Sequence, residues 1–119
     1  MRIVDRLLSG LLVLGALGHT FGVLEYYRSQ PDALYWSLTA GVLMVLLATL
    51  NLLRSWRPGD RALAWIAASA SAAYFVVTLG FGRLIGDFAD PRVIGFGVIS
   101  LGLVCFSVST ALRAAPASG

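Results

Sequence analysis

The sequence is poor in charged residues. Only 13% of its 119 residues are charged and 58% are hydrophobic, with a mean hydropathy of +0.82. Ordinary globular domains carry about 25% charged residues, so roughly half of the usual solvating surface is missing. This composition excludes a disordered chain and argues against a soluble domain. It favours a protein that crosses a membrane several times.

Cysteine, histidine and lysine are also scarce or absent. Cys105 is the single cysteine, so the chain can form neither an internal disulfide nor a dithiol redox centre. His19 is the single histidine, so a bis-histidine haem would need two subunits. We therefore expect no metal and no cofactor. Lysine is absent, and the nine arginines stand in short clusters beside apolar runs. That distribution is typical of membrane-flanking anchors, and no nucleic-acid partner is expected.

Four apolar runs are long enough to cross a bilayer, which needs about 20 residues in a helix. They cover residues 7–24, 34–53, 62–81 and 93–112, and none contains Asp, Glu, Lys or Arg. Helices are expected because each backbone group must find its partner within the segment. The sequence predicts an all-α fold: a four-transmembrane-helix bundle that forms a single membrane domain over residues 1–119. The first run is interpreted as a retained helix, since it is longer than a signal-peptide core and no Ala-x-Ala-like site follows it.

The arginines are unevenly distributed between the two predicted sides. Six lie at the N-terminus, in the loop of residues 54–61 and at the C-terminus, whereas three lie on the other side. The positive-inside rule then places both termini in the cytoplasm and residues 25–33 and 82–92 outside. The difference is moderate, which leaves a dual topology as the alternative.

Five polar residues are predicted at similar depth below the outer border of the helices. They are His19, Ser37, Tyr74, Thr78 and Ser100. In one interpretation their side chains hydrogen-bond across helices or to backbone carbonyls, as is usual in membranes. In the other they form a shallow ligand-binding pocket. Three roles are considered for His19 itself. It is a packing residue, a contact for a proton or lipid headgroup, or a metal or haem ligand, although it lacks partner ligands for the last role. Asn51, near the other end, is interpreted as a packing or capping residue.

Small residues recur at helical spacing on two of the predicted helices. Gly15, Gly18 and Gly22 share one stripe of the first, and Gly95 and Gly102 lie seven apart on the fourth. Such spacing lets helix backbones approach closely, so all five are predicted to be helix-packing residues. The stripe of the first helix is expected to face the bundle.

Two segments resemble a known kind of membrane protein. The run of residues 15–22, Gly-Ala-Leu-Gly-His-Thr-Phe-Gly, and the loop of residues 54–61, Arg-Ser-Trp-Arg-Pro-Gly-Asp-Arg, are broadly similar to DoxX-like four-helix proteins. The resemblance concerns the general layout. It implies a multi-pass protein of the bacterial cell inner membrane and brings no catalytic residues.

Two functions are compatible with these features. The first is a non-enzymatic accessory or scaffold subunit that acts through helix packing, as a homo-oligomer or within a larger membrane complex. The alternative is a binder or carrier of a small lipophile, a quinone or lipid, in an outer-leaflet pocket around His19. No enzymatic activity is expected, because Asp87 and Asp90 in the outer loop have no nucleophile or histidine at a readable spacing.

Overall fold

The computed structural model describes residues 2–114, which form four helices and no strands. The helices are α1 (Arg2–Tyr26), α2 (Pro31–Trp56), α3 (Arg61–Ile85) and α4 (Pro91–Arg113). All four are long and apolar enough to cross a membrane, which confirms the predicted four-helix membrane fold. Each helix extends beyond its apolar run, because the charged and aromatic residues at the borders are helical as well.

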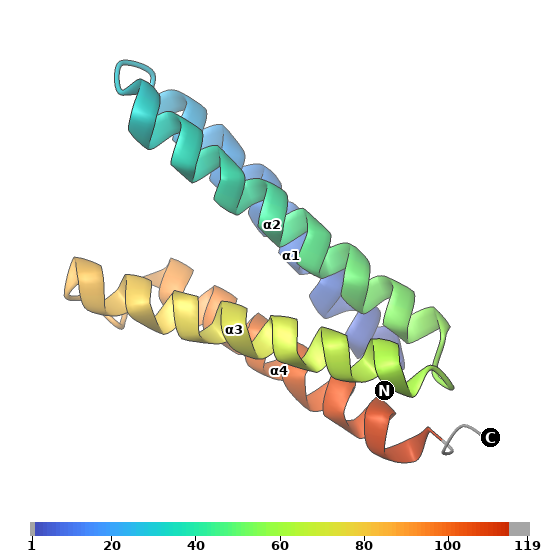
Figure 1. Cartoon of the computed structure of the whole chain (residues 1–119). Coiled ribbons are helices and arrows are strands. Elements are labelled where there is room, and N and C mark those ends of the chain that lie inside the picture. The colour runs from blue at the N-terminus through green and yellow to red at the C-terminus, as the bar shows by residue number, and fades with distance from the viewer. Residues whose placement is uncertain (1, 115–119) are drawn as a thin grey trace.

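The helices form two antiparallel hairpins, α1 with α2 and α3 with α4 (Figure 1). The hairpins lie close together at the end that holds the start of α1, the loop of residues 57–60 and the end of α4. We call this the terminal end. The hairpins separate toward the loops of residues 27–30 and 86–90, which we call the distal end. The fold is therefore a bundle that is closed at one end and splayed at the other.

The core joins the hairpins over the terminal half of the bundle. Its buried members are Leu12, Ala16, Met44, Leu47, Ala48 and Leu103. At its distal limit Phe96 meets Tyr74 edge-to-face, with ring centroids 6.3 Å apart. The same Phe96 ring lies 2.5 Å from where a Cβ on Gly15 would stand. Gly15 thus allows α1 to approach α4 at this level.

Further toward the distal end, the close approaches lie within each hairpin. A Cβ on Gly41 would meet the Thr20 hydroxyl at 2.5 Å, which brings α2 against α1. A Cβ on Gly82 would lie 3.0 Å from a methyl group of Val93, which brings α3 against α4. The distal halves are therefore two separate helix pairs.

Loop residues define where α3 begins and ends. The Asp60 carboxylate accepts a hydrogen bond from the Leu63 backbone N–H at 2.9 Å, satisfying one of the open donors at the helix start. Gly86 ends the helix in the left-handed conformation, with φ of 71°. Glycine takes this conformation without the steric cost that a side chain would add.

The start of α4 is fixed by Asp90. Its carboxylate accepts from the Arg92 backbone N–H at 2.8 Å and from two nitrogens of the Arg92 guanidinium, at 2.9 and 2.7 Å. The side-chain hydrogen bond from Arg92 lowers the pKa of Asp90 to about 2. The Arg92 guanidinium also lies over the Phe81 ring, 5.3 Å from its centre. These contacts tie the beginning of α4 to the end of α3.

Candidate functional site

A buried polar cluster crosses the bundle near its terminal end. Its centre is Arg54, whose side chain is completely buried. We call this cluster the Arg54 network. Its members come from all four helices and are Asp5, Asn51, Arg54, Ser71, Ser107 and Thr110.

Arg54 connects α2 to α1 and α4. One terminal nitrogen of its guanidinium forms an ion pair with the carboxylate of Asp5, which is itself buried. The other terminal nitrogen donates to the Thr110 hydroxyl at 3.1 Å. Longer contacts of 3.4 Å reach the side-chain oxygen of Asn51. A buried charge is costly unless it is paired and hydrogen-bonded, and Arg54 meets both conditions.

Asn51 extends the network to α3. Its amide nitrogen donates to the Ser71 hydroxyl at 3.0 Å and to the Leu47 carbonyl at 3.1 Å, while its side-chain oxygen accepts from Ser107 at 3.1 Å. In residues 2–114, no buried side-chain nitrogen or oxygen lacks a hydrogen-bond partner. Of the two predicted roles for Asn51, these contacts fit packing between helices.

The structure corrects the interpretation of Arg54 as a membrane-flanking anchor. Although Arg54 follows an apolar run in the sequence, its side chain turns into the bundle and meets Asp5, 49 positions away. Asp5 precedes the first apolar run, and its place in the sequence gives no sign of this partner. Neither residue was proposed as part of a site.

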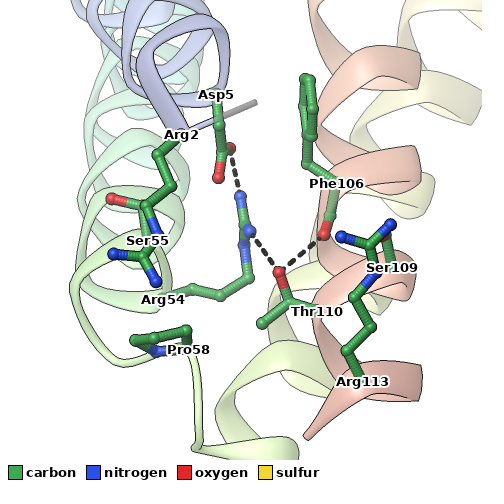
Figure 2. A pocket seen from close by; sticks show the side chains of 9 residues that line it. All are labelled: Arg2, Asp5, Arg54, Ser55, Pro58, Phe106, Ser109, Thr110 and Arg113. Atoms are coloured by element: carbon green, nitrogen blue, oxygen red, sulfur yellow. Dashed lines mark hydrogen bonds and ion pairs between the residues drawn. The ribbon is translucent and has the colours of Figure 1, made fainter.

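A cavity of about 290 Å³ adjoins the network at the terminal end (Figure 2). Its lining residues are Arg2, Asp5, Arg54, Ser55, Pro58, Phe106, Ser109, Thr110 and Arg113. Three guanidinium groups and three hydroxyls thus face one carboxylate, and Asp5 is already paired with Arg54. The cavity is cationic and rich in hydrogen-bond donors.

The five polar residues predicted to form an outer pocket are divided between the hairpins. His19 and Ser37 belong to the first hairpin, where the His19 Nε2 atom lies 3.0 Å from the Ser37 backbone carbonyl and donates to it. Tyr74, Thr78 and Ser100 belong to the second hairpin. Among the described residues, no hydrogen bond joins the two groups.

Two of the predicted pocket hydroxyls bond within their own helices. Thr78 donates to the Tyr74 carbonyl at 3.0 Å, and Ser100 donates to the Phe96 carbonyl at 2.6 Å. Such bonds from a side chain back to the preceding turn are usual for serine and threonine in helices. Among the described residues, no group of three or more His, Cys, Asp or Glu could hold a metal ion.

Replacing His19 by Ala should lower stability modestly, by about 0.6 kcal/mol, the average for an interhelical hydrogen bond in a membrane. The reason is that His19 is held by one carbonyl of the adjacent helix. Lipid extraction followed by mass spectrometry should find the co-purified quinone and lipid unchanged. A sharp loss of one bound lipophile, with the fold intact, would instead favour a headgroup site at His19.

The five glycines predicted to pack fall into two groups. Gly15 faces Phe96, and a Cβ on Gly102 would lie 2.6 Å from a methyl group of Leu8, so both permit contact between α1 and α4. Around Gly18, Gly22 and Gly95 no neighbouring helix lies within 4 Å of a Cβ position. The expectation that the whole stripe of the first helix faces the bundle is therefore corrected: its distal part lies on an open surface.

The Arg54 network and the residues of the predicted outer pocket differ in their accessibility to a ligand. The bonds around His19, Thr78 and Ser100 are closed within each hairpin, whereas the Arg54 network borders an open cationic cavity. The terminal end is thus the region where the described chain can meet a polar ligand. Comparison with protein-family models, curated proteins and solved structures finds no match to this chain.

Proposed function

We propose that this chain is a non-enzymatic accessory or scaffold subunit of a bacterial inner membrane, which acts by packing its helices against a second copy or a larger membrane complex. The observation that carries this proposal is the splayed distal half of the bundle. There the hairpins separate, and Gly18, Gly22 and Gly95 have open space around them (Figure 1).

The bilayer determines how such a surface can bind another helix. Apolar side chains gain little by leaving lipid, so helices associate through close packing where small residues let the backbones approach. Gly18 and Gly22 are four positions apart, which places them on one face of α1. The open glycines therefore provide a place where a further helix can approach closely.

The orientation belongs to the same proposal. The start of α1, the loop of residues 57–60 and the end of α4 share the terminal end (Figure 1). Six of the nine arginines lie in these segments or beside them in the sequence. The positive-inside rule supports a cytoplasmic position for this end.

Replacing Gly18 and Gly22 together by Leu should weaken self-association about tenfold, which corresponds to ~1.4 kcal/mol. The bulky side chains would hold an approaching helix away, while the open space around both positions leaves the monomer fold unchanged. Native mass spectrometry in mild detergent over a range of protein concentrations measures the effect.

The matched control replaces Gly10 and Gly80 by Leu, since both are helical glycines with open space around them outside the proposed contact. It should leave self-association unchanged. A wild-type chain that stays monomeric at every concentration, and that crosslinks to no other membrane protein in native membranes, would contradict the proposal.

A further inference from the structure

The cavity at the terminal end has the size of a small ligand site. Its volume of about 290 Å³ lies near the lower limit of small-molecule pockets, about 300–1,000 Å³. That space suits a headgroup or a small ion with its water, and it is too small for a whole lipid. The lining comes from α1, α2, α4 and the loop after α2.

Hydrogen-bond donors of this lining are available to a ligand. In the described range, the Arg2 guanidinium and the Ser109 hydroxyl have no hydrogen-bond partner of their own, although both line the cavity. Arg54 is held in place by its bonds to Asp5 and Thr110 and fixes one wall (Figure 2). The lining thus combines a rigid wall, formed by the Arg54–Asp5 ion pair, with the uncommitted donors of Arg2 and Ser109.

The charges select the class of ligand. Guanidinium groups bind carboxylate and phosphate oxygens in a planar, often bidentate arrangement. Asp5 would repel an anion, but its charge is compensated by Arg54. A phosphate group offers several acceptor oxygens, which match a lining made of guanidinium and hydroxyl donors.

The position of the cavity agrees with this choice. It lies where α1 begins and where α2 gives way to the loop of residues 57–60, at the border of the apolar runs. Basic pockets at this level between transmembrane helices bind anionic headgroups. Phe106 and Pro58 add apolar surface to the lining.

We propose that the cavity between Arg2, Arg54, Ser109 and Arg113 binds the phosphate group of an anionic ligand, supplied either by a phospholipid headgroup or by a free phosphate compound. This goes beyond the packing function proposed above, since it concerns the opposite end of the bundle.

The test uses delipidated full-length protein in neutral maltoside micelles with two probes. Phosphatidylglycerol represents the lipid headgroup and is counted as retained lipid by native mass spectrometry. Inorganic phosphate represents the free ion and is titrated by calorimetry. One of the two probes is expected to bind to the wild-type protein. The variant Arg2→Gln/Arg113→Gln should weaken binding of that probe at least about tenfold, because two charge-assisted contacts are lost. Arg54 stays intact so that the fold is kept, and helix content by circular dichroism verifies this.

The matched control is Arg57→Gln/Arg61→Gln, which removes the same charge from exposed positions at the same end. It should change binding less than about twofold, because these arginines lie outside the lining and the loss of an exposed surface charge is screened by salt. Binding of phosphatidylglycerol alone identifies a lipid as the source, and saturable binding of phosphate identifies a free compound. Equal losses in both double variants, or a wild-type chain that binds neither probe saturably, would overturn the proposal.

Discussion

Replacing Arg54 by Met should destabilise the bundle by about 3–5 kcal/mol, the usual cost of removing one partner from a buried ion pair. Arg54 is fully buried and is the ion-pair partner of Asp5. Without it, the Asp5 carboxylate remains between helices with no compensating charge. Reversible unfolding in mixed micelles of dodecyl maltoside and SDS, followed by circular dichroism, measures the difference in free energy.

A second variant separates the charge from the packing. The double change Asp5→Asn/Arg54→Met removes both charges, and replacing a whole buried pair by neutral groups is often nearly neutral in stability. Most of the loss should therefore be recovered. The control Arg57→Met alters an exposed arginine three positions away and should cost less than about 0.5 kcal/mol. A single Arg54→Met variant as stable as this control would show that Asp5 is not buried beside Arg54 in the membrane.

The helices could be predicted from the sequence because bilayer thickness imposes a length and a polarity on every span. Four uncharged runs determined their number, and the structure has them as α1 to α4. Their bounds were less predictable, since interfacial residues such as Arg2 and Trp56 continue the helices beyond the apolar runs.

The Arg54 network was missed although part of its signal lay in the sequence. Arg54 follows Asn51 by three positions, and Asn51 follows Ala48 by three, so the helical spacing places all three on one face. The spacing alone placed Arg54 on the buried face, whereas its position after an apolar run favoured an anchor. The partner Asp5 could not be inferred, because which helices pair across the bundle is decided by tertiary packing.

For the predicted outer pocket, the missing quantity is the distance between the helices. Counting residues gives the depth of His19 and Tyr74 along their helices but says nothing about the distance between the helices. Whether hairpins stay parallel or separate depends on side chains at their contact, such as Phe96 against Gly15 and Leu8 against Gly102. Side chains fill these contacts, and among the described residues no hydrogen bond joins the polar groups that the two hairpins carry at this depth.

The apolar contact between the two hairpins can be tested at Leu103, which is completely buried in the core. Leu103→Ala should destabilise the bundle by about 1–3 kcal/mol. This is below the usual 2–5 kcal/mol for soluble cores, because a helix separated in lipid keeps its leucine in an apolar solvent and only the cavity term is lost. The same micelle unfolding experiment measures it.

Leu101 provides the matched control two positions earlier on α4, where the side chain is 49% exposed. Leu101→Ala should change the free energy of unfolding by less than about 0.5 kcal/mol, since lipid or detergent fills the space that is left. Equal losses at the two positions would mean that α4 does not present Leu103 to α1 and α2, and the joined terminal half would have to be rejected. A large loss at Leu103 alone would show that apolar packing, together with the Arg54 network, joins the two hairpins there.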